Sequence, residues 1–159
     1  MTFKTTIISA AITGLCSFSV MAQQDPAVGQ WHTIDDKTGE VASLVTIATN
    51  EEGKLTGTIS KILKKDAGDG LCDKCPEPFT GKPIEGLQFM WGLSKDEPGV
   101  WEDGKLMDPE TGDVYNGKLE VQNGGKELEV RGYIGISLFG RSQVWQRAEQ
   151  LEAAENAEK

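Results

Sequence analysis

The sequence predicts an all-β protein, an eight-stranded antiparallel barrel in up-and-down order. Short apolar stretches recur roughly every 10 to 15 residues between turn signals, which is the pattern of strands joined by hairpins. A helical period is nearly absent after the N-terminal segment, whereas apolar and polar residues alternate along several stretches. Eight sequential strands can close on themselves, which removes exposed edges and leaves an interior for side chains or one small ligand.

The expected strands lie between segments rich in turn residues. In the seventh strand Leu128 and Val130 alternate with Glu127, Glu129 and Arg131, so one face is packed and the other is solvated. The joints "DDKTG", "NEEG", "DPETG" and "NGG" supply Asn, Asp or Gly where a turn needs positive φ or a side-chain cap. A two-sheet sandwich fits less well, because it usually needs longer crossing connections. The eight expected strands are residues 29–34, 41–49, 54–63, 86–93, 100–107, 113–122, 126–134 and 141–148.

Residues 1–22 have the features of a secretory signal peptide. One early Lys4 precedes an apolar, small-residue run that ends in Val20-Met21-Ala22, so we expect cleavage after Ala22. A lipoprotein would use Cys16, but Leu15 stands where a small residue is expected. No later stretch approaches the roughly 20 apolar residues of a membrane helix. We therefore expect a soluble, periplasmic or secreted chain.

Length and charge limit what the mature chain can be. Residues 23–148 are long enough for one domain and too short for two. The formal net charge is −9, and loss of Lys4 with the signal peptide makes the chain more acidic still. The negative electrostatic field of such a chain repels polyphosphates, and the sequence has no stripe of basic residues to counter it. Nucleic acid is therefore not an expected partner.

Two segments stand outside the strand pattern. Residues 64–85 form a long loop rich in Gly, Pro, Asp and Lys, and loops longer than about 15 residues in a compact domain are usually functional or disordered. Residues 149–159, "EQLEAAENAEK", form an acidic tail, which we expect to be a frayed helix or disordered.

The long loop carries Cys72 and Cys75 in the stretch "GLCDKCPEP". After export these two remain as an even pair in an oxidising compartment, so a structural disulfide is the default expectation. A redox-active pair is an alternative, but such a pair usually lies at a helix N-terminus, and no helical pattern is found here. A metal site is a third alternative. Zinc needs two more ligands, and His32 is the single histidine.

Other chemistry has little support in the sequence. Pro76 stands where a haem attachment motif needs His, and "GISLFG" lacks the spacing of a hydrolase nucleophile elbow. The acidic turns "DPETGD" and "KDAGDG" lack the ligand spacing of a calcium loop, and no glycine-rich phosphate loop follows a strand. We therefore expect no catalytic residues, no resident metal and no cofactor.

Several ordered motifs resemble one bacterial family. The stretches "VGQWHTIDDKTGE", "LCDKCP", "GLQFMWGL", "WEDGKLMDPETGDVY" and "LEVRGYIGISLFGRSQVWQR" together resemble the exported family called domain of unknown function 2147 (DUF2147). The resemblance extends from Val28 to Arg147. It implies a lipocalin-like barrel of the kind that binds small apolar molecules, and it implies no defined biochemical activity.

The lipocalin resemblance includes a Gly-x-Trp motif in the first strand, matched by Gly29 and Trp31. In lipocalins the Trp closes the narrow end of the barrel and an Arg of the last strand packs across its face. Arg147 is the first choice for this partner, and Arg141, at the other end of the same strand, is the alternative. The second lipocalin motif, a Thr-Asp-Tyr turn before the seventh strand, is absent, and "NGG" occupies its place.

The aromatic residues on the strands either fill the core or line a cavity. Our leading hypothesis is a non-catalytic module that binds a small apolar or amphipathic molecule in the barrel. The alternatives are a scaffold for protein contacts in the envelope and a thiol redox role for the Cys pair. From alternation, the residues expected to line a cavity are Ile59, Phe89, Trp91, Tyr115, Leu119 and Val130.

Overall fold

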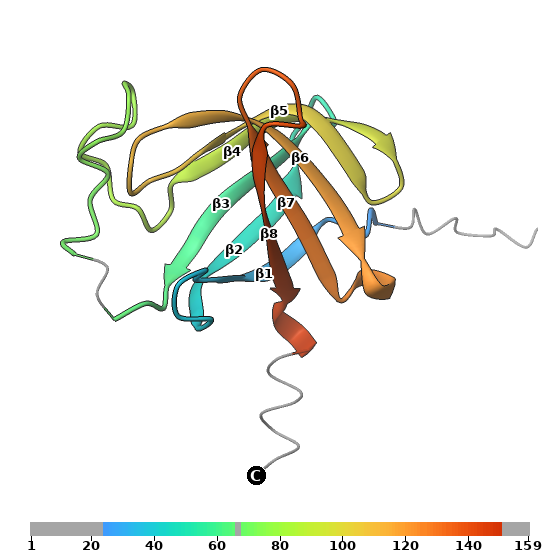
Figure 1. Ribbon diagram of the computed structural model, residues 1–159, viewed down its shortest axis with the longest axis horizontal. Coiled ribbons are helices and arrows are strands. Elements are labelled where there is room, and N and C mark those ends of the chain that lie inside the picture. The colour runs from blue at the N-terminus through green and yellow to red at the C-terminus, as the bar shows by residue number, and fades with distance from the viewer. Residues whose placement is uncertain (1–23, 66–67, 151–159) are drawn as a thin grey trace, which may run out of the picture.

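The computed structural model is a closed barrel of eight antiparallel strands in sequential order, with β1 pairing with both β2 and β8 (Figure 1). The structure describes residues 24–65 and 68–150. The predicted fold class is therefore confirmed. The predicted signal peptide, its alternative lipid site at Cys16 and residues 151–159 of the acidic tail lie outside the described residues.

Each strand forms where a stretch of alternating apolar and polar residues lies between two segments rich in turn residues. Asn50 illustrates the turn chemistry, because its side-chain oxygen accepts hydrogen bonds from the N–H groups of Glu52 (3.0 Å) and Lys54 (2.9 Å) and so shapes the turn between β2 and β3. The strands are β1 (Gly29–Ile34), β2 (Val41–Thr49), β3 (Leu55–Ile62), β4 (Gln88–Glu97), β5 (Val100–Met107), β6 (Val114–Gln122), β7 (Glu127–Tyr133) and β8 (Gly140–Arg147), with a short 3-10 turn, η1 (Asn123–Gly125), between β6 and β7.

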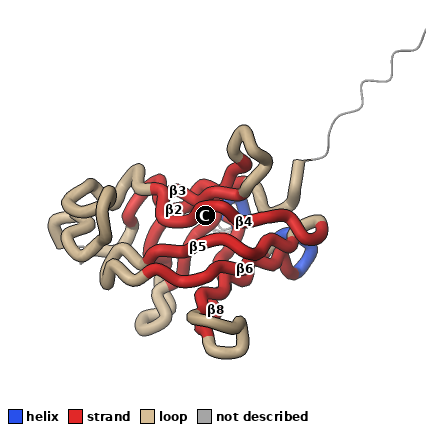
Figure 2. The backbone as a smooth tube through the Cα atoms, turned by 90° about the horizontal axis from the view of Figure 1, so that it is seen from above, coloured by secondary structure: helices blue, strands red, loops and turns tan. Residues whose placement is uncertain are grey.

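The up-and-down order gives the barrel two different ends. One end, here called the open end, carries the β1–β2 turn, the long loop 63–87, the β5–β6 turn and the loop 134–139 between β7 and β8. The long loop extends to one side of the strands (Figure 2). The other end, here called the closed end, carries the β2–β3, β4–β5 and β6–β7 turns together with the N-terminal residues 24–28.

The closed end is filled by large apolar side chains. Trp31, Leu55, Leu93, Leu119 and Leu128 are all fully buried there. Apolar burial of this kind stabilises a folded chain by about 25 cal/mol per Å². The core therefore fills the closed half of the barrel, and any space for a ligand lies toward the open end.

Asp25 holds the N-terminal segment across the closed end. Its carboxylate accepts hydrogen bonds from Ala27 N (2.9 Å) and Trp101 Nε1 (3.0 Å), and it pairs with Lys95 Nζ at 2.9 Å. Burial raises the pKa of Asp25, but the hydrogen bonds from Ala27, Trp101, Lys95 and Gly99 outweigh it, so the net pKa lies below the ordinary value. The contacts that keep the Asp25 carboxylate charged are formed by the folded barrel.

Among the described residues, no helix is long and apolar enough to cross a membrane.

Candidate functional site

A cavity of about 780 Å³ opens at the open end of the barrel. This volume lies within the range of about 300 to 1,000 Å³ that is typical of small-molecule sites. Side chains from all eight strands line it, as do residues of the loops at this end. The apolar lining residues are Ile34, Ala42, Val45, Ile59, Ile62, Ile84, Phe89, Leu106, Met107, Pro109, Val130, Ile134, Phe139 and Trp145.

The deep wall of the cavity is apolar. Val45, Ile59, Leu106 and Val130 are buried and line it. Phe89 and Trp145 pack as a tilted aromatic pair with ring centroids 6.1 Å apart. A ligand that enters this space meets hydrocarbon and aromatic surface, which favours an apolar group there.

One side of the rim is an ion-pair cluster. Lys64 Nζ lies 3.1 Å from Asp35 Oδ2 and 3.3 Å from Glu110 Oε1, so it links the β1–β2 turn to the β5–β6 turn. The hydrogen bond from Lys64, followed by those from the N–H groups of Lys37 and Thr38, holds the pKa of Asp35 well below its usual range. The pKa of Lys64 is raised, chiefly by its hydrogen bond to Asp35. Both groups stay charged at neutral pH.

A second polar chain runs from the rim into the cavity wall. Asp36 pairs with Arg141 and accepts a hydrogen bond from Gln143 Nε2 at 2.7 Å. Trp145 Nε1 in turn donates to Gln143 Oε1 at 3.2 Å. Because the indole N–H has a partner, Trp145 presents its ring to the cavity without leaving a buried donor unsatisfied.

Tyr115 adds a hydroxyl near the rim. Burial and the neighbouring Asp113 and Asp108 carboxylates raise the pKa of Tyr115, so its hydroxyl is protonated at neutral pH. It donates a hydrogen bond to Asp113 Oδ2 at 3.4 Å. The cavity thus combines an apolar interior with a rim whose charges largely satisfy one another.

Four of the six side chains expected to line a cavity do so, namely Ile59, Phe89, Tyr115 and Val130. Leu119 does not line it. It is fully buried in the closed half of the barrel, where its backbone pairs with Trp101 and Val130. Its inward direction follows the alternation, but its depth along the strand puts it in the filled core.

Trp91 also lies outside the cavity, because a β-bulge interrupts β4. The register between β3 and β4 shifts between the pairs Gly57↔Met90 and Thr58↔Gln88, and both Phe89 and Met90 are buried. One extra residue in a strand reverses the faces of the residues that follow. Trp91 is therefore only half-buried and packs against Phe79 of the long loop, with ring centroids 5.8 Å apart.

The sequence interpretation missed most of the polar rim. Asp36 and Lys64 lie in turn segments, and Arg141 was considered only as a partner for Trp31. Arg141 instead lies at the open end, with its side chain 69% exposed. Charged turn residues give no local signal that they meet across a barrel mouth, because their partners are far away in the sequence.

The long loop forms one wall of the cavity mouth and is fixed by a disulfide between Cys72 and Cys75, whose Cα atoms are 5.4 Å apart. Both sulfur atoms lie beside the Pro109 carbonyl oxygen, at 3.8 and 4.0 Å. A side chain at Gly112 would collide with the Lys74 carbonyl, since a Cβ there would lie 1.9 Å from it. The disulfide loop is thus packed closely on the β5–β6 turn.

The closed end contains the Gly-x-Trp arrangement that the sequence suggested. The Arg147 guanidinium lies 4.1 Å from the centre of the Trp31 ring, and Trp31 Nε1 donates to Ala27 O at 2.9 Å. Gly29 has a φ of 137°, and a Cβ there would lie 2.8 Å from Arg147 Nη1. The backbone angle therefore favours glycine here, and a larger residue would push the arginine away from its present position.

No group of three or more His, Cys, Asp or Glu side chains that could hold a metal ion is found in residues 24–65 and 68–150. His32 lies on β1, where it pairs with Leu44 and Gln146, and its Nδ1 atom is buried without a hydrogen-bond partner. His32 does not line the cavity.

Comparison with known proteins identifies the family. The model of a bacterial family described as "Uncharacterized protein conserved in bacteria (DUF2147)" matches residues 29–147. The chain belongs to the DUF2147 family. The matched segment starts at Gly29 and ends at Arg147, so the DUF2147 domain begins and ends with the two residues that meet at the closed end of the barrel.

The DUF2147 fold is also found in a solved structure. Protein HP1028 from the human pathogen Helicobacter pylori, described as belonging to the lipocalin family, superposes with a TM-score of 0.67 at 18% sequence identity. The match covers 81% of this chain and 88% of HP1028. At this identity the likeness shows that the DUF2147 barrel is lipocalin-like. No curated protein sequence matches the chain.

Proposed function

We propose that this DUF2147 protein binds one small amphipathic molecule in its barrel, with the apolar part of the molecule inside and its polar part at the rim. The observation that carries the proposal is the cavity of about 780 Å³ with a buried apolar wall. Pockets of this form, apolar with a few polar groups at one end, are typical of ligand sites. The lipocalin-like fold supports the same reading.

The rim favours a ligand whose polar group is neutral or zwitterionic. Of the three cations that line the cavity, Lys64 is paired with Asp35 and Glu110 and Arg141 is paired with Asp36, whereas Lys37 forms no ion pair with another described residue. A headgroup with a net charge would compete with the paired charges of the rim, whereas a hydroxyl or amide could hydrogen-bond to them in place. We propose a binding role without catalysis.

We further propose that the protein works outside the cytoplasm. The disulfide between Cys72 and Cys75 supports an oxidising compartment. Cys72 is fully buried and Cys75 is 4% exposed, and exchange with another thiol needs access to a sulfur. These exposures support a structural role for the disulfide over a redox one.

The proposal is tested by titration with N-phenyl-1-naphthylamine, a neutral apolar dye whose fluorescence rises in apolar sites. Val130→Trp places a large ring in the cavity, since Val130 is 6% exposed and lines it. Val144→Trp is the matched control, because Val144 lies on the paired strand β8, is 44% exposed and does not line the cavity. Thermal melts establish that both variants fold.

We expect the unmodified protein and Val144→Trp to bind about one dye per chain, and Val130→Trp to bind at least about tenfold more weakly, the equivalent of about 1.4 kcal/mol. Absence of saturable dye binding, or equal binding by Val130→Trp, would refute the cavity as the site.

A further inference from the structure

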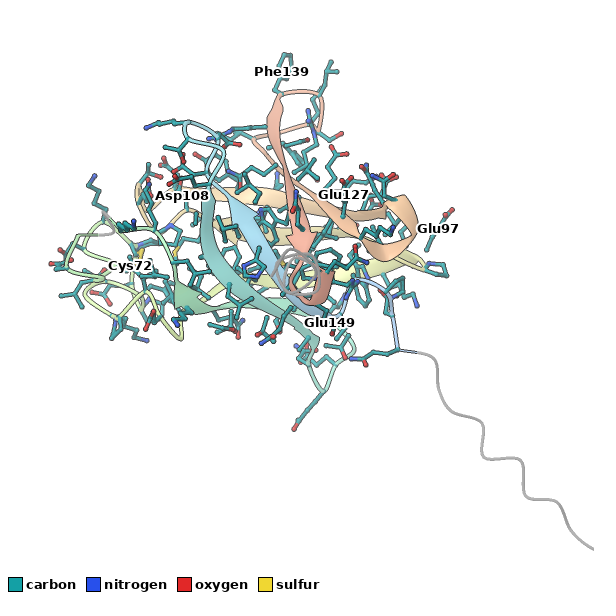
Figure 3. The ribbon with its side chains drawn as sticks, turned by 90° about the horizontal axis from the view of Figure 1, so that it is seen from below. Cys72, Glu97, Asp108, Glu127, Phe139 and Glu149 are labelled. Carbon is teal, nitrogen blue, oxygen red and sulfur yellow. A yellow bond between two sulfur atoms is a disulfide. The ribbon has the colours of Figure 1, made fainter. Side chains whose placement is uncertain are left out.

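The loop between β7 and β8, residues 134–139, is an apolar tip at the open end. Ile134, Ile136, Leu138 and Phe139 are 70%, 62%, 75% and 71% exposed, the largest exposures of big apolar residues in the part of the chain that the structure describes. Phe139 lies at an extremity of the molecule and points away from the barrel (Figure 3). No Asp, Glu, Lys, Arg or His stands between Arg131 and Arg141. An exposed apolar cluster of this kind marks an interaction surface.

The backbone of the tip is held in place by the protein itself. Ile134 N donates to Phe139 O at 3.3 Å, and Phe139 N donates to Ile136 O at 3.1 Å. The Arg131 guanidinium donates to Ser137 O (2.8 Å) and Leu138 O (3.4 Å) from the neighbouring strand. These bonds satisfy two N–H groups and four carbonyl groups of the tip, which lowers the cost of placing it in a medium of low polarity.

We propose that the apolar tip inserts into the surface of a phospholipid bilayer. A stable protein interface involves about 20 to 30 residues a side, far more than this narrow tip offers. A fluid lipid surface, in contrast, can surround side chains that project in several directions. Arg131 and Arg141 stand at the base of the tip, on the paired strands β7 and β8, at the level where lipid phosphates would lie.

The charge of the chain selects the kind of membrane. The formal net charge of −9 opposes a strongly anionic surface, so the tip fits a zwitterionic phospholipid best. The hydrophobic contact of the tip must then provide the affinity.

The tip is continuous with the cavity, because Ile134 and Phe139 also line its mouth. Insertion of the tip would bring the mouth of the barrel to the headgroup level of the membrane, with the tip itself among the acyl chains. The inference goes beyond ligand binding, since it concerns the outer side of the loop and does not require an occupied cavity.

The test is co-sedimentation with phosphatidylcholine vesicles at about 0.15 M salt, with protein purified from cells that express the full chain. Leu138→Ser/Phe139→Ser removes the two most exposed side chains of the tip. Leu71→Ser/Val144→Ser is the control, because these residues are 41% and 44% exposed, Leu71 lies in the long loop and Val144 pairs with Glu129, away from the loop 134–139. Val130→Trp distinguishes vesicle binding by the tip from ligand binding in the cavity, because this variant blocks the cavity and leaves the tip intact.

We expect the unmodified protein, the control and Val130→Trp to bind vesicles equally, and the tip variant to bind at least about tenfold more weakly. The inference is overturned if the unmodified protein stays in the supernatant, if the tip variant binds as well as the unmodified protein, or if the control is weakened as much as the tip variant. A dimer that the tip variant abolishes, without vesicle binding, would instead assign the tip to a second copy of the chain. Dye binding by the tip variant is measured in parallel, so failure of one proposal leaves the other testable.

Discussion

Arg147 is predicted to be a main determinant of stability at the closed end. Its guanidinium covers the Trp31 ring at 4.1 Å and donates hydrogen bonds to the carbonyl oxygens of Val28 (3.5 Å), Gly125 and Pro26. It therefore joins the N-terminal segment, the β6–β7 turn and the last strand. Arg147→Met removes all of these contacts, whereas Arg147→Lys keeps the charge but loses the planar fork.

The size of the effect follows from these contacts. A desolvated cation–π contact contributes about 2 kcal/mol, and a hydrogen bond from a charged group contributes about 1.5 to 3 kcal/mol. Such contributions do not add fully, and Arg147 is only half-buried, so we expect Arg147→Met to lower the free energy of unfolding by about 3 kcal/mol. For a domain of this size that corresponds to a fall in Tm of roughly 10 °C. Arg147→Lys should cost about half as much.

The assay is urea unfolding, followed by tryptophan fluorescence and circular dichroism. Arg141→Met is the control, because Arg141 lies on the same strand but is exposed and pairs with Asp36 at the open end. An exposed ion pair contributes about 0 to 1 kcal/mol, so this variant should unfold almost as the unmodified protein does. A change below about 1 kcal/mol for Arg147→Met, or equal changes for both variants, would contradict a main stabilising role for Arg147.

The remaining predictions concern Asp25 and the disulfide. The pKa of Asp25 is lowered from 3.8 in the folded state, so its carboxylate stabilises the fold above that pH, and this contribution is lost as pH falls through the folded pKa. Asp25→Asn should lower the free energy of unfolding, measured with urea, by about 1 to 2 kcal/mol at pH 7. At pH 2 its free energy of unfolding should differ less from that of the unmodified protein. Equal differences at the two pH values would contradict this prediction. Cys72→Ser/Cys75→Ser should lower the free energy of unfolding by about 2 kcal/mol, because the disulfide closes a short ring. An unchanged urea midpoint would contradict a structural role for the disulfide.

The strands were predictable because two local signals agree, namely alternation and turn residues. The bounds of β1, β2 and β5 are those expected, and most others differ by a residue or two. The exception is β4, which was expected to end at Leu93 and continues to Glu97. Its last residues are charged and carry no apolar signal, but Lys95 and Glu97 pair with β5 across a tight turn at Pro98 and Gly99.

The site was predictable only in part, because lining a cavity depends on more than facing inward. Ile59, Phe89, Tyr115 and Val130 face inward near the open end, and alternation was enough to find them. The prediction for Trp91 was wrong because a bulge at Phe89 and Met90 turns its side chain to the outer face of the barrel. A bulge leaves no clear mark in one sequence. The prediction for Leu119 was wrong because the position of a side chain along the barrel axis depends on the stagger of all eight strands.

The rim and the apolar tip depend on tertiary structure for a different reason. Asp36 and Arg141 are far apart in the sequence and meet because β1 and β8 close the barrel. The tip residues, from Ile134 to Phe139, are apolar in sequence and so resemble strand or core. In the folded chain Arg131 binds the carbonyl groups of Ser137 and Leu138, and the tip side chains lie outside the barrel.

Native mass spectrometry of the protein purified from its own host tests the central proposal most directly. We expect a co-purifying small molecule at about one per chain, which dissociates on denaturation. The same adduct should be retained by Val144→Trp and lost from Val130→Trp. The mass of the polypeptide alone, in every preparation from that host, would contradict a ligand-binding barrel.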